Sequence, residues 1–363
     1  MKSTILHLKK LDWMLIAVAL ALVVIGFLSL YSSSLGKGDF SNFKKQAVFF
    51  GMGFSLMLGL SFFDYKILRE NSYLILFLYL LSLIALAGLL IFAPQIRGVR
   101  GWYKIGPLSF DPIEPTKIIV VLILAKYFSK RHIEMYKIRH ILLSGFYVLV
   151  PSMLIFFQPD FGSAILFVIL WIGILLISGI KIRHFLILLL CMLLLFGLTW
   201  SFLLKDYQKD RILSFVFPQR DPKGESWSQA QAKIAVGSGG FLGEGIGQGS
   251  QVKYGFLPEP QTDFITAAIA EETGIVGIGI LLFLFALFFW RILKIALESA
   301  SNFSRLFVSG IGIILFSQAV IHIGVNLGIF PVIGLSLPLV SYGGSGLIFT
   351  FVSLGILQGI KTH

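Results

Sequence analysis

The chain has little charge and almost no cysteine. Asp, Glu, Lys and Arg make up 13% of the 363 residues, hydrophobic residues make up 56%, and Cys191 is the single cysteine. One cysteine excludes an intramolecular disulfide and a cysteine metal cluster. The sequence also lacks HExxH, GxSxG and Cys–His patterns, so nothing in it supports a zinc protease or a serine hydrolase.

The sequence is instead rich in long apolar runs. Its mean hydropathy is +0.88, and a soluble domain of this size could not keep so much apolar surface away from water. Ten runs are long enough to cross a bilayer core of about 30 Å. They cover residues 12–32, 44–63, 73–93, 112–129, 140–157, 161–180, 184–204, 264–290, 304–328 and 338–360. The sequence therefore predicts an all-α integral membrane protein of about ten transmembrane helices. We expect a single polytopic domain over 1–363, with a large extracytoplasmic loop at 205–262 between helices seven and eight.

The distribution of basic residues predicts the orientation in the membrane. With a cytoplasmic N-terminus, inner segments hold 16 of the 30 Lys and Arg residues and the short outer loops hold 6. Segment 205–262 holds 7, and Lys117 lies within a span. Short cytoplasmic loops of membrane proteins carry an excess of positive charge. Both termini are therefore expected in the cytoplasm and segment 205–262 outside. The net charge of +12 reflects this bias and an attraction to anionic headgroups, so no nucleic-acid partner is expected.

The segment "LSFDPIEPTKIIVVL" (108–122) brings charge into a predicted span. Asp111 and Pro112 resemble an N-cap and the first residue of a helix, and Glu114 falls where a capping-box carboxylate would lie. Lys117 follows Glu114 by three residues, on the same helix face. Because charge at membrane depth is costly, the two residues form either a structural ion pair or a cation held for an anionic ligand.

Three other segments interrupt the apolar pattern. Asp160, in "FFQPDFGSAILF" (156–167), either caps the sixth span or faces a water-filled groove. Seven glycines within residues 237–249 predict backbone that passes close to a ligand or packs against helix ends. The preceding residues, 228–237, form a mildly amphipathic stretch that fits a short interfacial helix. Two prolines and four glycines within 330–346 predict broken backbone, which is tolerated at membrane depth only where protein or water surrounds it.

The stretch "EPQTDFITAAIAEETG" (259–274) places three carboxylates at the start of the eighth span. Thr262 or Asp263 could cap that helix. Asp263 is expected at the outer interface, where a carboxylate could also serve as a general base. Glu271 and Glu272 lie about 12 Å deeper by helix rise, so we interpret them as structural or groove-lining residues.

Six motifs, in this order along the chain, resemble the SEDS family of membrane proteins, the RodA/FtsW/SpoVE group. They are "LDW", "FDPIEPTK", "QPDFGSA", "QAKIAVGSGGFLGEGIGQG", "FLPEPQTDFITAAIAEETG" and "PVIGLSLPLVSYGGSG". The chain departs from the family at three places. Gly101 separates Arg100 from Trp102, which are adjacent in the family, and "FQPSELAK" and "SYGGSS" have become "FDPIEPTK" and "SYGGSG".

The resemblance implies a fold of ten membrane helices with a large outer loop between the seventh and eighth. It also implies a function at the outer face of the bacterial cytoplasmic membrane, where SEDS proteins polymerise peptidoglycan glycan strands from lipid II. The expected partners are lipid II, a class B penicillin-binding protein that cross-links the product, and other elongation-complex proteins. The short N-terminus and "LDW" favour a RodA-like role in elongation and rod shape over an FtsW-like role in division.

The resemblance also assigns site residues. By motif, Asp263 matches the family's essential acid and is the expected catalytic residue. The substrate-binding or supporting residues expected from the matching motifs are Glu114, Lys117, Asp160, Trp102, Arg100, Lys233 and Ser341. Glu114 and Lys117 match the family's Glu/Lys pair, and Asp160 matches another intramembrane acid.

The residues fit this chemistry, because transfer from a lipid pyrophosphate to a sugar hydroxyl needs one general base. The leaving pyrophosphate needs positive charge or a metal ion, so Mg²⁺ or Mn²⁺ is a candidate cofactor whose ligands cannot be read from the sequence. Two other hypotheses remain open. One is a lipid II flippase or another transporter, which buried charges and broken helices would also suit. The other is a non-catalytic scaffold that positions a synthase.

Overall fold

The computed structural model describes residues 7–95, 99–106, 108–130, 138–202, 206–217 and 225–362, and these are largely helical. Each predicted apolar run falls on one helix. In chain order these helices are α2 (Trp13–Lys37), α3 (Ser41–Ser61), α5 (Ser72–Phe92), α6 (Ile113–Ser129), α7 (Ile138–Phe157), α8 (Phe161–Ile177), α9 (Ile182–Phe202), α13 (Ile265–Glu298), α14 (Asn302–Asn326) and α15 (Gly344–Thr362). Within the described ranges, seven of them are long and apolar enough to cross a membrane. The other three are α3, α6 and α8, of which α6 and α8 have 17 residues each. The all-α membrane fold is therefore confirmed, and the count of ten crossings stays a prediction.

The outer segment, which was predicted from the sequence as a loop at 205–262, is partly helical. It includes α10 (Asp206–Val216), α11 (Glu225–Ser238) and α12 (Ser250–Lys253). The stretch that the sequence marked as a short amphipathic helix lies within α11. Residues 205 and 218–224 of this segment lie outside the described residues, as do 131–137.

A short β-hairpin was not expected from the sequence. Strand β1 (Tyr103–Ile105) pairs antiparallel with β2 (Leu108–Phe110), so that Tyr103 lies opposite Phe110. The Tyr103 hydroxyl donates to the Ala85 carbonyl of α5 at 2.7 Å. The hairpin is therefore attached to the bundle, with Trp102 at its entry and Asp111 at its exit.

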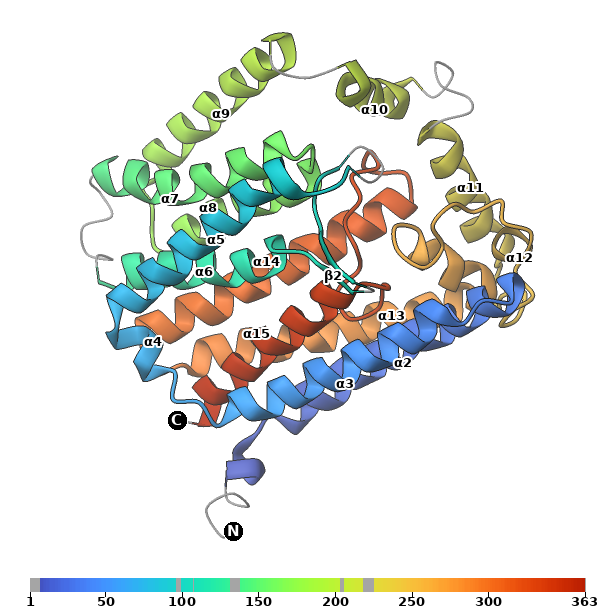
Figure 1. Ribbon diagram of the computed structural model, residues 1–363, viewed down its shortest axis with the longest axis horizontal. Helices are drawn as coiled ribbons and strands as arrows, with labels where there is room; N and C mark the ends of the chain where they lie inside the picture. The colour runs from blue at the N-terminus through green and yellow to red at the C-terminus, as the bar shows by residue number, and fades with distance from the viewer. Residues whose placement is uncertain are drawn as a thin grey trace.

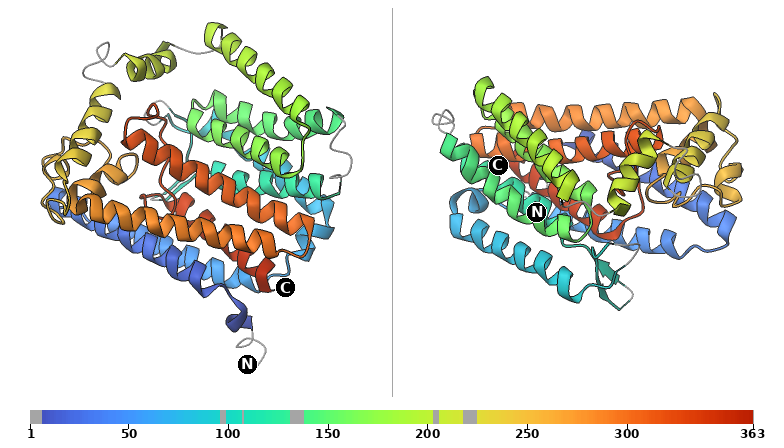
Figure 2. Two further views of the ribbon diagram at one scale, coloured as in Figure 1. Left: turned by 180° about the vertical axis from the view of Figure 1, so that it is seen from behind. Right: turned by 90° about the horizontal axis from the view of Figure 1, so that it is seen from above.

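Helix α14 organises the bundle. It packs against α6, α8 and α13, and Figure 1 shows it in the middle of the packed helices. Helix α13 in turn packs against α2, and α15 packs against α3. Figures 1 and 2 show α9 and α10 set apart from the packed helices, and no residue in the most apolar part of α9 is buried by protein. Residues carried on α14 can therefore reach groups from several other helices.

The start of α2 and the end of α15 lie at one end of the bundle, at the lower left of Figure 1. There the Asp12 carboxylate is 1% exposed and accepts hydrogen bonds from Lys361 at 2.7 Å and from Arg291, whose Nε lies at 3.2 Å. It also caps α2 by accepting from the Leu15 N–H at 3.0 Å. One buried carboxylate thus connects α2, α13 and α15, and this gives "LDW" a structural role. The short helix α4 (Lys66–Glu70) lies at the same end.

Replacing Asp12 with Asn should destabilise the protein by about 3 kcal/mol, because Arg291 and Lys361 would then share a site without their counter-charge. Thermal unfolding of the purified protein in detergent would measure this. Asp64→Asn is the matched control, because Asp64 and its partner Lys66 are both exposed and 4.0 Å apart. An exposed pair contributes at most about 1 kcal/mol. Equal effects of the two substitutions would contradict the role assigned to Asp12.

Candidate functional site

Helix α13 breaks at Gly274, whose φ and ψ of 64° and −162° are not helical. The break leaves backbone groups on both sides without their usual partners. Residues 240–245 replace the missing bonds: their N–H groups donate to the carbonyls of Glu271 and Glu272 at 2.9 and 3.0 Å. Their carbonyls accept from the two residues that follow Gly274, at 3.0 and 3.3 Å. The glycine-rich segment is therefore part of the helix break, and the alternative of packing against a helix is confirmed for it.

The side chains of Glu271 and Glu272 hold the same segment. Glu271, fully buried, accepts from the N–H groups of Gln251 at 2.6 Å and Val252 at 3.2 Å, at the start of α12. Glu272, 5% exposed, accepts from the Gly247 N–H at 3.3 Å and from the Ser32 hydroxyl of α2. Both acids are bonded to protein groups and have a structural role.

Asp263 lies just before the short half-helix formed by residues 265–273. The N-cap position is Phe264, so the expectation that Thr262 or Asp263 occupies it is wrong. Asp263 is half-buried. Asp263 therefore directly precedes the positive end of the half-helix dipole.

Two side chains hold the backbone at Asp263. Asn326 donates to the Asp263 carbonyl at 2.9 Å and accepts from the Ala267 N–H at 3.0 Å. Ser341 donates to the Thr262 carbonyl at 2.9 Å. Ser341 was expected to support the site, and in the structure it bonds to the residue that precedes Asp263. Asn326 was missed in the sequence.

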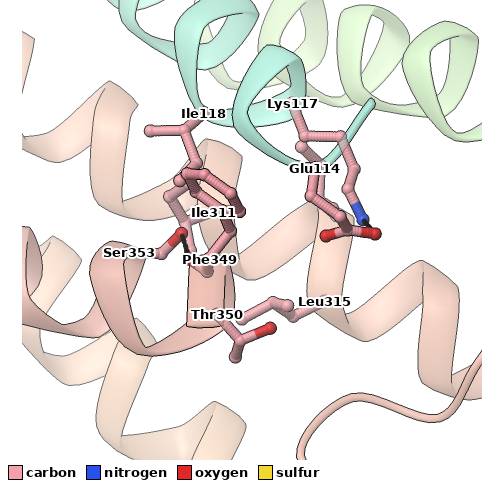
Figure 3. Close-up of a pocket in the computed structure, with 9 residues that line it drawn as sticks. Glu114, Lys117, Ile118, Ile311, Leu315, Phe349, Thr350 and Ser353 are labelled. Carbon is pink, nitrogen blue, oxygen red and sulfur yellow. Dashed lines mark hydrogen bonds and ion pairs between the residues drawn. The ribbon is translucent and has the colours of Figure 1, made fainter. Parts of the chain in front are cut away.

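Glu114 and Lys117 form an ion pair in the first turns of α6, with Nζ and Oε1 2.8 Å apart (Figure 3). Lys117 is 7% exposed and also donates to Gln318 of α14 at 3.4 Å. The capping-box interpretation of Glu114 is wrong. The helix begins at Ile113 with Pro112 as its N-cap, so Asp111, which the sequence predicted as the cap, lies one position before it and accepts from the Ile113 N–H at 2.8 Å. Its own N–H donates to Ser345 rather than to Glu114.

A small cavity lies beside the Glu114–Lys117 pair, between α6, α14 and α15 (Figure 3). Its volume is about 20 Å³, which is room for one water molecule. Most of its lining is apolar, including Ile118, Leu315 and Phe349. The pair is therefore enclosed by protein, and in this structure Lys117 is bonded to Glu114 and Gln318.

A polar stripe on α14 connects the two groups. Gln318, His322 and Asn326 lie four residues apart and so share one helix face. Gln318 contacts Lys117, and Asn326 contacts Asp263, so the two anchor points are about 12 Å apart along the helix. His322 bonds through Nδ1 to the Leu335 carbonyl at 2.7 Å, as expected of a buried histidine, and its Nε2 has no partner in the described part of the chain.

Asp160 caps α8, as one of its two interpretations predicted. It accepts from the Ser163 N–H at 3.0 Å and from the Ser163 hydroxyl at 2.7 Å. Burial raises the pKa of Asp160, and the bonds from Ser163 lower it. Burial raises the pKa of Asp111 well above its ordinary value, and the Glu114 carboxylate raises it further. The charges of Asp111, Glu114, Asp160 and Lys117 act on one another, so these residues form one acidic cluster with a single lysine.

Arg100 and Trp102 lie at the entry of the hairpin. The Arg100 N–H donates to the Gln158 carbonyl at 3.3 Å, two residues before Asp160. The exposed guanidinium donates to the Leu90 carbonyl in the last turn of α5 at 2.7 Å. Trp102 is half-buried. The backbone at Arg100 is thus close to the Asp160 turn, and the guanidinium has a structural contact.

Lys233 extends from α11 across the end of α14. Its side chain is exposed and passes over Gly328, where a Cβ would overlap it. Gly328 has a φ of 72° and comes two residues after Asn326. Lys233 therefore reaches the same end of α14 as Asp263 and Ser341. No group of three or more His, Cys, Asp and Glu side chains able to hold a metal ion occurs among the described residues.

The comparisons with known proteins agree with one another. A family profile for FtsW, RodA and SpoVE, described as "Cell cycle protein", matches residues 11–363. Peptidoglycan glycosyltransferase MrdB of Escherichia coli K12 is 34% identical over 100% of this chain and 96% of that protein. Stage V sporulation protein E of Bacillus subtilis is 33% identical over 97% of each chain. A probable peptidoglycan glycosyltransferase FtsW of Thiomicrospira cyclica is 34% identical over 98% and 92%.

Solved structures share the fold. The rod shape determining protein RodA of Thermus thermophilus superposes with a TM-score of 0.71 at 30% identity, over 97% of this chain and 96% of that one. A chain from a peptidoglycan synthase complex that coordinates polymerization and crosslinking superposes with a TM-score of 0.83 at 33% identity, over 97% of both. With a profile match and relatives that extend along nearly its whole length, the chain belongs to the FtsW/RodA/SpoVE family.

Proposed function

We propose that this protein is a membrane glycosyltransferase that polymerises peptidoglycan glycan strands from lipid II, with Asp263 as the general base. The observation that carries the proposal is the placement of Asp263. Asp263 is a half-buried residue just before the N-cap of a half-helix. Asn326 bonds to its backbone carbonyl, and Ser341 bonds to the carbonyl of the preceding residue, Thr262. Relatives at 34% identity are named peptidoglycan glycosyltransferases, which supports the same reaction.

In this reaction the Asp263 carboxylate accepts the proton of the attacking sugar hydroxyl. The hydroxyl oxygen forms a bond to the anomeric carbon of the growing strand, and the bond from that carbon to the lipid pyrophosphate breaks. The pyrophosphate leaves with the electron pair. Lys233 reaches the same end of α14 as Asp263 and supplies positive charge there.

A divalent cation, Mg²⁺ or Mn²⁺, would neutralise charge on the leaving pyrophosphate when bound. Mg²⁺ in such sites is held by one or two carboxylates together with substrate phosphates rather than by an all-protein cage. A single half-buried carboxylate such as Asp263 is enough for that mode.

Charge and the positions of the two ends of the bundle support one orientation in the membrane. The start of α2 and the end of α15 lie at one end of the bundle, and α14 begins near that end. Asp263 is held at the other end of α14, its C-terminal end. With the more basic end in the cytoplasm, both termini lie on the cytoplasmic side of the membrane and Asp263 lies on the outer side. Lipid II is then polymerised on the side where the cell wall is built.

The partner that suits this activity is a class B penicillin-binding protein, whose transpeptidase domain would cross-link the new strands. The structural relative in a complex of polymerisation and crosslinking supports this pairing. We assign the protein to elongation and rod shape, because MrdB and the RodA structure are among its relatives. The division relatives named FtsW have a similar identity, so cell-shape rescue in a strain depleted of its own elongation polymerase is the test of this assignment.

The reaction itself is tested by incubating the purified protein and a purified class B penicillin-binding protein with lipid II. Glycan polymer is the expected product. The broken helix at Gly274 and the irregular segment 327–343 are also features of transporters, so a second assay measures movement of labelled lipid II across proteoliposomes. Lipid movement without polymer would replace the proposal with a flippase.

Replacing Asn326 with Ala should lower kcat by about 10- to 100-fold and change KM for lipid II little. The substitution removes the bonds to the Asp263 carbonyl and the Ala267 N–H, and an error of about 1 Å in the base costs about 100-fold in rate. Steady-state kinetics with the folded variant would measure both constants. A rise in KM with an unchanged kcat would show that Asn326 acts on binding instead.

A further inference from the structure

A cavity opens at the end of the bundle that carries the termini, far from Asp263. It lies between the end of α4, the end of α6 and the turn between α13 and α14, and its volume is about 520 Å³. Helix α14 begins at this cavity with Asn302 and ends at Asn326 beside Asp263. A helix of 25 residues spans about 37 Å, which exceeds the roughly 30 Å of a bilayer core. The cavity is therefore at the membrane face opposite Asp263, at the depth of the headgroups.

The cavity has an excess of positive charge. Three cations line it, Arg69, Lys126 and Lys130, against one carboxylate, Glu70. Arg69 pairs with Glu70 at 3.1 Å. Lys126 donates to the Arg69 carbonyl. The backbone N–H of Lys130 donates to the Phe128 carbonyl, and its side chain has no hydrogen bond or ion pair to any described residue. Two lysines thus face the cavity without a carboxylate partner among the described residues.

The excess of basic residues in cytoplasmic loops explains exposed lysines, and the negative end of a helix explains a lysine in its last turn. Lys126 is in the last turn of α6, so the helix dipole accounts for a cation at that place. It does not account for the burial of Lys126, which is 9% exposed and whose ammonium group has only a backbone carbonyl as its partner. Lys126 and Lys130 are also four residues apart on one helix, a spacing at which like charges repel. A buried cation beside a second one needs a counter-charge, and an anion in the cavity would supply it.

The rest of the lining suits a phosphate group on a lipid. The Ser129 hydroxyl lines the cavity and donates to the Lys126 carbonyl at 3.1 Å. Ser301 and Asn302 lie at the start of α14, where the helix dipole favours negative charge. Phe303 adds an apolar wall next to these polar groups. We propose that this cavity binds the phosphate headgroup of an anionic phospholipid from the leaflet on that face. This site is separate from the polymerisation site and does not depend on the proposed function.

The test compares the purified full-length protein with the Lys126→Gln, Lys130→Gln double variant. Native mass spectrometry would titrate phosphatidylglycerol onto each protein, with phosphatidylcholine as the zwitterionic lipid and inorganic phosphate as the free anion. Loss of two cations near a membrane surface weakens binding of an anionic lipid by about 30-fold. Lys294→Gln is the matched control, because Lys294 lies at the same end of the bundle, 45% exposed, outside the cavity. It should bind phosphatidylglycerol as the wild type does.

Ser129→Asp provides a test that does not depend on losing a lysine. A carboxylate placed in the cavity should take the place of the phosphate and remove the increase in unfolding temperature that phosphatidylglycerol gives to the wild type in detergent. Lys130→Gln alone keeps the test valid if the double variant fails to fold, since Lys130 is exposed. Equal binding of phosphatidylglycerol by wild type and lysine variants would overturn the site. Saturation by inorganic phosphate without a preference for the lipid would overturn the lipid as its source.

Discussion

Asp263→Asn should abolish most glycan polymerisation, lowering kcat by about 10²- to 10⁴-fold, which is the usual contribution of a general base. Asn has the size of Asp and cannot accept the proton of the attacking hydroxyl. The fold around it should survive, because Asn326 and Ser341 bond to backbone carbonyls in this segment rather than to the carboxylate. The N-cap of α13 is Phe264, so the helix does not depend on Asp263 as a cap.

The measurement is polymer formation from lipid II by the variant, with the class B penicillin-binding protein present and thermal unfolding recorded in parallel. Glu259→Gln is the matched control, because it removes one negative charge from the same segment four residues earlier. The control should keep most of the activity. A folded Asp263→Asn protein that makes polymer at the wild-type rate would exclude Asp263 as the base and move the search to Glu114 and Asp160.

Those features of the site that depend on neighbouring residues were predictable from the sequence. Glu114 and Lys117 are three residues apart in a helix, so their pairing needs only the local geometry of α6. Asp160 caps α8 for the same reason, because its partner Ser163 follows at the usual capping distance. Each apolar run likewise identified one helix, since hydropathy and length are local properties.

The missed features depend on contacts between distant parts of the chain. The capping-box interpretation of Glu114 failed because α6 has Pro112 rather than Asp111 as its N-cap, and the Asp111 N–H donates to Ser345, 234 residues away. In the sequence, Gln318 and Asn326 are polar residues in an apolar run, eight positions apart and so on one face of a helix. Their partners, Lys117 and Asp263, belong to α6 and to the segment before α13, which no periodicity brings together. The hairpin at 103–110 is held by α5, so short strands there had no local signal.

The break in α13 is the clearest example of this limit. Residues 264–290 have the hydropathy of one continuous span. Nothing in the sequence marks Gly274 as the site of a helix break more than Gly277 or Gly279. What stabilises the break is the segment 240–245, which supplies the hydrogen bonds that a straight helix would make within itself. Irregular backbone at membrane depth needs such a partner. The half-helix that begins next to Asp263 therefore depends on residues 240–245, which come about twenty positions earlier.

Gly274→Ala should for that reason lower both stability and activity. A φ of 64° with a ψ of −162° is accessible almost only to glycine, and another residue there costs about 1–3 kcal/mol. The new Cβ would also lie 2.5 Å from the Gly243 nitrogen and 2.6 Å from the Phe241 carbonyl oxygen, both of them backbone atoms that cannot rotate away. The glycine-rich segment or the half-helix must then move. A shift of about 1 Å at Asp263 would lower kcat by about 100-fold.

Gly279→Ala, in the same helix, is the matched control because a Cβ at Gly279 meets no atom within 4 Å. Alanine is favoured over glycine in a helix interior by about 1 kcal/mol, so this variant should unfold at the same or a higher temperature and keep its activity. Thermal unfolding and lipid II polymerisation of both variants separate a general effect of added bulk in α13 from an effect of the break. If Gly274→Ala behaved like Gly279→Ala, α13 could straighten without loss of stability or activity. The half-helix and its glycine-rich partner would then have no part in holding Asp263 in place.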